Sequence, residues 1–230
     1  MRVGVVTFPG TLDDFDAARA VRFAGGESVS LWHGDEDLAK VDAVILPGGF
    51  SYGDYLRCGA IARFAPMMSS IIEGAKNGLP VLGICNGFQI LCESGLLPGA
   101  LLHNDSRKFI CKNVFIKAEN NTTILTNSVP VKALKIPIAH GEGKYFADTE
   151  TLDKMKANGQ IIFKYCNDNG EITADSNPNG ATENIAGVCN AGKNVFGMMP
   201  HPERAADELL GNIDGKFLFE SILKGILVNA

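Results

Sequence analysis

The sequence predicts an α/β fold in which a mostly parallel central sheet is flanked by helices, with an antiparallel portion in the C-terminal half. Two observations carry this prediction. In the first half of the chain, short and fully apolar runs alternate with helical patterns, as in parallel sheets that helices cover on both faces. From about Lys112 onward, strand-like segments follow one another with few helices between them, which favours antiparallel pairing.

The first half supplies the elements of the parallel sheet. The expected strands are Val3–Thr7, Ser28–Leu31, Ala43–Leu46 and the apolar run that leads into Cys85. The expected helices are Asp13–Ala24, Cys58–Phe64, Met67–Asn77 and a helix that begins directly after Cys85. In the first of these helices, Phe15, Ala18, Val21 and Phe23 are the apolar positions, and we expect them to face the sheet.

The second half supplies the antiparallel part. The expected strands are Asn113–Lys117, Ile136–Ala139, Ile161–Tyr165, Ile185–Cys189 and Val195–Met199. Turn residues at Asn167–Gly170 and Ala191–Lys193 predict hairpins, and Phe217–Leu227 predicts a closing amphipathic helix. The sequence contains no repeat, linker or low-complexity segment, so we expect a single domain over residues 1–230.

Composition limits the class of protein. With 46% hydrophobic residues among 230, the chain can bury a sizeable core, and a net charge of −5 gives no reason to expect nucleic acid as a partner. No apolar run approaches the roughly 18 residues of a membrane span, and the N-terminal run is too short for a signal peptide. We therefore expect a cytoplasmic protein without a membrane partner.

Cysteines and histidines are scattered along the chain. The six cysteines form no C-x-x-C pair, and a cytoplasmic chain of this size seldom has a disulfide framework. Five of them lie in apolar or strand-like settings, where cysteine behaves as a small hydrophobe. The four histidines lack the spacing of metal ligands, so we expect no metal site.

Cys85 differs from the other cysteines in its surroundings. The segment Gly83-Ile84-Cys85-Asn86-Gly87 joins an apolar strand to a helical pattern, which is the cysteine version of a nucleophile elbow. Such a turn lifts the sulfur out of the sheet, and the helix N-terminus favours the thiolate over the thiol. The other interpretation is a structural cysteine at a strand end.

A second stretch, His201-Pro202-Glu203, offers the acid and base groups that a nucleophilic thiol needs. Residues i and i+2 of an extended segment project to the same side, and Pro202 pushes His201 toward an extended conformation. Glu203 can then hold one imidazole nitrogen while the other faces the thiol, which gives a triad of Cys85, His201 and Glu203. Alternatively, the prolyl loop only caps the next helix.

Three further groups are candidates for contact with substrate. Gly48 and Gly49 end a strand of the same sheet, and an N–H there can form an oxyanion hole with the amide of Asn86. From this motif alone, an ordinary strand-to-loop turn is the favoured interpretation of the two glycines. Gln89 can reach the pocket with its side-chain amide, although solvation at the surface is the competing interpretation.

These residues resemble the class I, or triad-type, glutamine amidotransferases, which have a flavodoxin-like α/β fold. The motifs of the class are Gly83–Gln89 and His201–Glu203. Within the class, the chain resembles the glutaminase subunits of phosphoribosylformylglycinamidine synthases, and the stretches that carry this likeness are Leu46–Ala60, Ala139–Gly143, Asn177–Gly180 and Gly197–Arg204. The loop Thr11–Asp14 departs from the small polar residues expected there, and we expect this departure to leave the chemistry untouched.

The resemblance implies a glutaminase that forms a γ-glutamyl thioester on Cys85 and passes ammonia to a synthetase. It implies that His201 acts as acid and base, that Glu203 holds its tautomer, and that Gln89 binds L-glutamine. It also places Ala139 and His140 near the pocket. The implied partners are the synthetase subunit, which uses ATP and Mg to convert formylglycinamide ribonucleotide to formylglycinamidine ribonucleotide, and a small accessory subunit. No cofactor is expected in this chain.

Two other functions stay open at this point. One is a cysteine hydrolase of the DJ-1/PfpI type, which shares the fold and the elbow; in that family a histidine usually follows the cysteine, where this chain has Asn86. The other is a non-catalytic, glutaminase-like subunit with a regulatory role, and the presence of all three triad residues argues against it.

Overall fold

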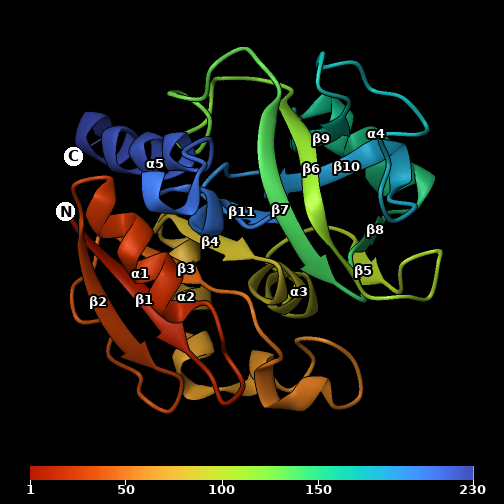
Figure 1. The fold of residues 1–230 in the computed structure, drawn as a ribbon. Coiled ribbons are helices and arrows are strands. Elements are labelled where there is room, and N and C mark those ends of the chain that lie inside the picture. Colours follow the sequence, from red (N-terminus) through yellow and green to blue (C-terminus); the bar gives the residue numbers. More distant parts are fainter. Residues whose placement is uncertain (230) are drawn as a thin grey trace.

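A nine-stranded mixed sheet forms the centre of the computed structural model, which describes residues 1–229 (Figure 1). Its strands lie in the order β2 (Glu27–Trp32), β1 (Arg2–Thr7), β3 (Ala43–Leu46), β4 (Val81–Ile84), β11 (Val195–Met198), β10 (Ile185–Cys189), β9 (Ile161–Cys166), β6 (Ile110–Ala118) and β7 (Leu134–His140). The first five are parallel to one another, and the pairs from β11 onward to β7 are antiparallel. The predicted fold class is confirmed.

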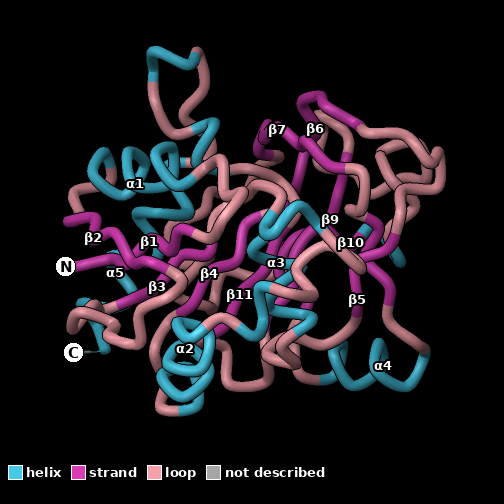
Figure 2. The backbone as a smooth tube through the Cα atoms, turned by 90° about the horizontal axis from the view of Figure 1, so that it is seen from below, coloured by secondary structure: helices cyan, strands magenta, loops and turns pink. Residues whose placement is uncertain are grey.

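Helices cover both faces of the parallel half (Figures 1 and 2). On one face lie α1 (Asp14–Phe23) and α5 (Lys216–Asn229), and on the other lie α2 (Pro66–Lys76) and α3 (Asn86–Glu93). The predicted inner face of α1 was partly wrong. Its buried residues are Ala17, Ala20 and Val21, whereas the side chain of Phe15 is 82% exposed, because small residues let the helix approach the sheet closely.

Two predicted elements take a different form. The expected helix Cys58–Phe64 is wrong: only Ala62–Phe64 forms a short 3₁₀ turn. Gly59 has a φ of 79°, and a Cβ there would lie 2.7 Å from the Ile90 backbone nitrogen, so the chain bends to pack against α3. Asn167–Gly170 does form a turn, but residues 171–184 follow before β10 begins, so it is not a hairpin.

The sequence analysis missed one helix and two short strands. These are α4 (Thr149–Ala157) and a two-stranded sheet of β5 (Ala100–Leu102) and β8 (Lys144–Phe146). A signal for α4 was present, because Asp148 is a good N-cap residue and accepts a hydrogen bond of 2.8 Å from the Thr151 amide. The two strands of three residues are too short to show a period. The predicted hairpin at Ala191–Lys193 joins β10 to β11 and is confirmed.

The carboxyl ends of β1, β3, β4 and β11 meet at one edge of the sheet, since these strands are parallel neighbours. Ligands of open α/β sheets bind beyond this edge. The antiparallel end of the sheet curls toward the same edge, and the His201 amide, which follows β11, donates a 2.8 Å hydrogen bond to the Pro137 carbonyl of β7. Both halves of the sheet therefore contribute to one region.

Replacement of Asn194 with alanine should destabilise the fold. Its side-chain amide donates to the carbonyls of Ala75 and Leu79, at 2.7 and 3.0 Å, where α2 leads into β4. Alanine removes this donor from the Leu79 carbonyl and, among the described residues, leaves the Ala75 carbonyl with only the Gly78 amide, at 3.1 Å. We therefore expect Asn194→Ala to lower the free energy of unfolding by about 2 kcal/mol. Urea titration measures this value, with the exposed Asn169→Ala as the matched control. Equal midpoints for the two variants would contradict the prediction.

Candidate active site

Cys85 lies at the sharp turn between β4 and α3 and has a φ of 52° and a ψ of −105°. A positive φ is rare for a residue with a Cβ and is costly unless the surroundings enforce it. Here the Cys85 amide donates to the Met198 carbonyl at 2.8 Å, and its carbonyl accepts from the Gln89 amide at 3.1 Å. The predicted elbow therefore forms, and it holds the sulfur at the edge of the sheet.

The two glycines of the elbow are explained by close packing. A Cβ on Gly87 would lie 1.9 Å from the Leu46 carbonyl oxygen, and one on Gly83 would lie 2.6 Å from the Gly87 backbone. Any side chain at these positions would push α3 away from β3. The turn is possible because three backbone segments touch one another without intervening side chains.

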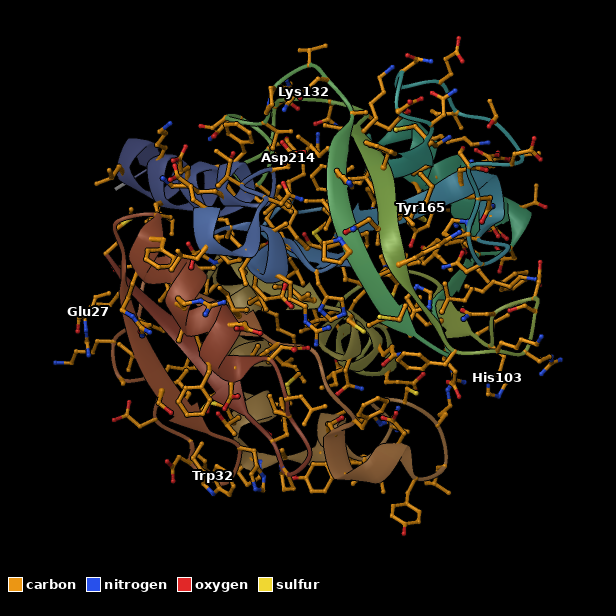
Figure 3. The ribbon with its side chains drawn as sticks, viewed as in Figure 1. Glu27, Trp32, His103, Lys132, Tyr165 and Asp214 are labelled. Carbon is orange, nitrogen blue, oxygen red and sulfur yellow. The ribbon has the colours of Figure 1, made fainter. Side chains whose placement is uncertain are left out.

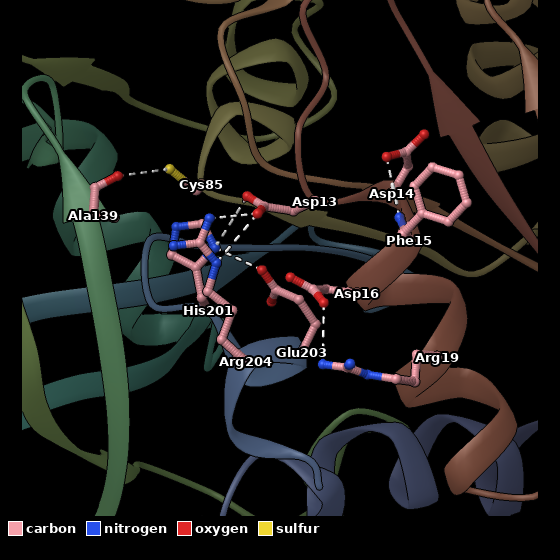
Figure 4. A network of polar contacts seen from close by, with 10 residues as sticks. All are labelled: Asp13, Asp14, Phe15, Asp16, Arg19, Cys85, Ala139, His201, Glu203 and Arg204. Atoms are coloured by element: carbon pink, nitrogen blue, oxygen red, sulfur yellow. Dashed lines mark hydrogen bonds and ion pairs between the residues drawn. The ribbon is translucent and has the colours of Figure 1, made fainter. Parts of the chain in front are cut away.

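His201 and Glu203 form the predicted pair beside the cysteine, although Glu203 lies in the 3₁₀ turn Pro202–Ala205 and not in the extended segment that the sequence suggested. His201 Nδ1 lies 2.6 Å from Glu203 Oε1, and both residues are about 1% exposed. His201 Nε2 has no hydrogen-bond partner among the described residues. Figure 4 shows the imidazole between Glu203 and the Cys85 sulfur. The thiol, the imidazole and the carboxylate are thus brought together in the order that the triad requires.

Charge around the imidazole favours its protonated form. Burial by itself lowers the pKa of His201, but the Glu203 carboxylate and the Cys85 sulfur outweigh it and raise the pKa well above the usual value. A protonated imidazole next to a thiol stabilises the thiolate, which is the nucleophilic form of cysteine. The arrangement is suited to nucleophilic attack followed by proton donation to a leaving group.

Asp13 also reaches this imidazole, which the sequence analysis did not anticipate. Asp13 Oδ2 lies 3.6 Å from His201 Nδ1, and Asp13 Oδ1 accepts hydrogen bonds from Arg204 Nε, at 3.2 Å, and from a terminal guanidinium nitrogen (Figure 4). The departure of the loop Thr11–Asp14 from the family was expected to leave the chemistry untouched; the Asp13 side chain of this loop, which is 4% exposed, lies beside His201. No sequence motif signalled this contact.

A cavity of about 180 Å³ opens beside the cysteine sulfur. Its lining includes Gly49, Cys85, Gln89, Ala139 and His140. Gly48 lies directly behind it, where a Cβ would meet the Asp13 carboxylate and the His201 ring. Asn86 is the first residue of α3, so its backbone N–H has no partner within the helix. Five of the predicted site residues therefore line this cavity, whereas His201 and Glu203 do not line it and lie behind Gly48.

Gln89 is buried in the cavity wall, so the interpretation of a solvated surface residue is wrong. Its Nε2 donates to the Glu142 carbonyl at 2.7 Å, and its Oε1 accepts from Asn86 Nδ2 at 2.9 Å. The Asn86 side chain in turn accepts from the Ser51 amide at 3.1 Å. These bonds connect α3 to the loop that follows β3 and to the loop that follows β7.

His140 is held as a neutral imidazole in the opposite wall. Its Nδ1 lies 3.1 Å from Asn104 Oδ1, and its Nε2 lies 3.5 Å from Asn179 Nδ2. Burial, aided by the nearby His201, lowers the pKa of His140 to about 4. Both ring nitrogens are engaged, so His140 supports the wall, in which the Ala139 carbonyl faces Cys85 Sγ at 3.7 Å.

Carboxylates line the mouth of the cavity. Asp54 and Glu142 lie there, and Asn86 Nδ2 donates to Asp54 Oδ1 at 3.3 Å. His103, which follows β5, has its Nδ1 3.4 Å from Glu142 Oε1 (Figure 3). The lining contains no lysine or arginine, so the mouth suits a ligand that carries an ammonium group.

Two other features carry less chemistry. Asp13, His201 and Glu203 bring potential ligand atoms within 4.8 Å of one another, but Asp13 is already paired with the Arg204 guanidinium and Glu203 with the imidazole. A larger hollow of about 520 Å³ lies between the end of α2 and the β10–β11 turn, and its lining contains no cysteine, histidine or carboxylate. Among the described residues, no helix is long and apolar enough to span a membrane.

Comparisons with known proteins agree with this geometry. Residues 1–217 match the model of the CobB/CobQ-like glutamine amidotransferase domain. The chain is 55% identical over 224 residues to the phosphoribosylformylglycinamidine synthase subunit PurQ of Chlorobaculum parvum, covering 96% of this chain and 89% of the relative. It is 54% identical over 228 residues to the PurQ subunit of Rhodococcus jostii, covering 98% of both chains.

A solved structure gives the same result. The structure of PurLQS from Thermotoga maritima contains a chain that superposes with a TM-score of 0.85 at 45% identity, covering 97% of both chains. Sequence and fold thus agree over almost the full length. The chain belongs to the CobB/CobQ-like glutamine amidotransferases and, within them, to the family of phosphoribosylformylglycinamidine synthase subunits PurQ.

Proposed function

We propose that the chain hydrolyses L-glutamine to glutamate and ammonia through a γ-glutamyl thioester, as the glutaminase subunit of a phosphoribosylformylglycinamidine synthase. One observation carries the chemistry. Cys85 is held at a strained elbow beside His201, whose Nδ1 is 2.6 Å from Glu203. The substrate and the pathway step rest on the family to which the chain belongs.

The proposed reaction has two steps. The Cys85 thiolate attacks the side-chain amide carbon of glutamine, and the protonated His201 donates its proton to the departing nitrogen, which leaves as ammonia. Water then attacks the thioester carbon while His201 takes a proton from it, and the thiolate departs to release glutamate. Glu203 keeps the Nδ1 proton of the imidazole in place throughout.

The oxyanion of each tetrahedral intermediate is assigned to the backbone amides of Gly49 and Asn86. Support comes from the Gly48 carbonyl, which accepts from the Leu12 and Asp13 amides at 3.2 Å each. In a trans peptide the N–H of Gly49 then points the other way. Gln89 is assigned to substrate binding, with Ala139 and His140 forming the facing wall.

Ammonia is proposed to pass to a synthetase subunit that converts formylglycinamide ribonucleotide to formylglycinamidine ribonucleotide, with a small accessory subunit in the complex. ATP and Mg are assigned to that synthetase. Exposed apolar residues near the cavity support docking at its mouth. Phe50 and Phe109 line the cavity at 45% and 54% exposure, and Tyr55 and Leu56 lie exposed in the loop that follows Phe50.

The amidotransferase domain is proposed to occupy residues 1–230, of which residue 230 lies outside the described part. Support comes from the single main sheet that joins β1 to β11.

We also propose a cytoplasmic location, which agrees with six free cysteines, one of them exposed. Membership of the amidotransferase family leaves no observation in favour of the DJ-1/PfpI alternative, and the assembled Cys85, His201 and Glu203 argue against a purely regulatory subunit.

Replacement of Cys85 with serine tests the proposed function. A hydroxyl is far harder to deprotonate than a thiol, so Cys85→Ser should lower glutamine hydrolysis about a thousandfold or more. Glutamate release by the assembled complex is the measurement. Amidation supported by free ammonia should survive, and Cys111→Ser, at an exposed cysteine, should behave as the wild type. Hydrolysis by the Cys85→Ser variant at near the wild-type rate would refute the assignment.

The roles of His201 and Glu203 predict unequal losses. His201 carries the proton, whereas Glu203 only orients and charges the ring, so His201→Ala should lose about ten to a hundred times more of kcat than Glu203→Ala. Both are measured at saturating glutamine in the complex, with thermal melting as a check on folding. The exposed Glu208→Ala is the matched control for loss of a carboxylate. Wild-type kcat in both variants would place the base elsewhere.

A further inference from the structure

The loop that follows β1 is joined by backbone hydrogen bonds to the loop that follows β3. The Phe50 amide donates to the Gly10 carbonyl at 2.9 Å, and the amides of Leu12 and Asp13 both donate to the Gly48 carbonyl at 3.2 Å. Thr11 and Gly49 form a β-bridge between the two loops. The orientation of the Gly48–Gly49 peptide is thus set by the backbone of Asp13 and its neighbour.

The side chain of Asp13 divides its two oxygens between two partners. Oδ1 is held by two nitrogens of the Arg204 guanidinium, and Oδ2 lies 3.6 Å from His201 Nδ1. Because Arg204 is a planar, permanently charged donor, it fixes the plane of the carboxylate as well as its position. Oδ2 therefore lies near the same imidazole nitrogen that Glu203 Oε1 approaches at 2.6 Å.

Packing at Gly48 shows that these groups form one unit. A Cβ on Gly48 would lie 2.4 Å from Asp13 Oδ2 and 2.8 Å from His201 Cε1. The carboxylate and the ring therefore pack directly on the peptide that carries the proposed oxyanion donor. A shift of Asp13 cannot occur without movement of the ring, the peptide or both.

We propose that Asp13 is a positioning residue that fixes the His201 imidazole through its side chain and the Gly49 amide through its backbone. The inference rests on the proposed glutaminase function and deepens it. Asp13 does not line the cavity, so it acts through these two groups and not by contact with glutamine. Asp13, in the loop that follows β1, thus fixes the position of the His201 ring relative to the Gly49 amide.

Charge is the second part of the role. The groups that face the His201 ring are Glu203 from its own turn, Asp13 from the β1 loop, Cys85 from the elbow and His140 from β7. Burial opposes the imidazolium, the Glu203 and Asp13 carboxylates and the Cys85 sulfur favour it, and Arg204 offsets part of the charge on Asp13. His140 is neutral and adds no charge. Loss of the Asp13 charge should therefore let the imidazolium lose its proton at a lower pH.

The experiment is the pH profile of glutamine hydrolysis by the assembled complex with Asp13→Asn. The imidazolium is the acid that protonates the departing amide nitrogen, so kcat/KM falls as pH rises through the pKa of His201. We expect the alkaline limb of the profile to move to lower pH by about one unit. This is the lower end of the pKa shifts that a neighbouring charge causes, because Arg204 partly compensates the charge of Asp13. We also expect kcat to fall about tenfold, with KM for glutamine changed less than twofold.

Two further variants separate positioning from a structural role. Asp14→Asn removes the same charge from the next residue, whose carboxylate accepts from Thr7 Oγ1 at 2.9 Å, and it should leave the alkaline limb in place. Arg204→Lys keeps the positive charge, but lysine cannot hold Asp13 Oδ1 with two nitrogens. As a single substitution it should lower kcat. In combination with Asp13→Asn it should lower kcat little further, because the partner of Arg204 is already changed.

The outcomes are distinct. An alkaline limb within 0.2 unit (about the precision of such a profile) of the wild type in a folded Asp13→Asn variant would overturn the inference. If that variant does not fold, Asp13→Ser, which leaves room for a water, is judged by the same profile. Absence of glutaminase activity in the wild-type complex would instead count against the proposed function. An active wild type, an inactive Cys85→Ser variant and an unchanged Asp13→Asn profile would reject the role of Asp13 alone.

Discussion

The strained backbone at Cys85 is the constraint on which the rest of the site depends. A residue at φ 52° and ψ −105° is unfavourable by about 1 to 3 kcal/mol, and it persists because β4 lies between two parallel neighbours. The Met198 carbonyl holds the amide of Cys85 from β11, and Gly87 packs directly on the Leu46 carbonyl of β3. The strands that fix the elbow are therefore the same strands whose ends deliver His201 and Gly49.

Burial of charge is the second constraint. Asp13, Glu203 and His201 are all at most 3% exposed, and isolated charges at such depth are strongly unfavourable. The network stays balanced because Arg204 pairs with Asp13 and the imidazole pairs with Glu203. Glu203 Oε2 remains without a hydrogen-bond partner among the described residues, so full compensation of that carboxylate depends on a protonated His201. A proton on His201 thus stabilises the network and prepares the thiolate at once.

Sequence alone predicted much of this arrangement because its signals are local. An apolar strand, two glycines and a helical pattern identify the elbow without tertiary information, and Pro202 fixes the spacing of His201 and Glu203. The helix expected at Cys58–Phe64 failed because Gly59 packs on α3, a contact that no local pattern reveals. Asp13 was missed for the same reason: it lies 188 positions before His201, and only the pairing of parallel strands brings the two together.

In the facing wall, Ala139 and His140 were expected near the pocket only through the family resemblance, and the side-chain amides that hold them were not anticipated. Asn104 accepts from the Gly143 amide and donates to the His140 carbonyl, and Asn179 donates to the Gly143 carbonyl. Asparagine is common in surface turns, so its positions in the sequence do not distinguish a residue that connects buried backbone groups from one in an exposed loop. The parallel half carries the groups proposed to react, and the antiparallel half holds the Ala139 carbonyl opposite the sulfur. The cavity beside the sulfur is lined by residues of both halves, so a site whose reacting groups lie at one edge still depends on the whole sheet.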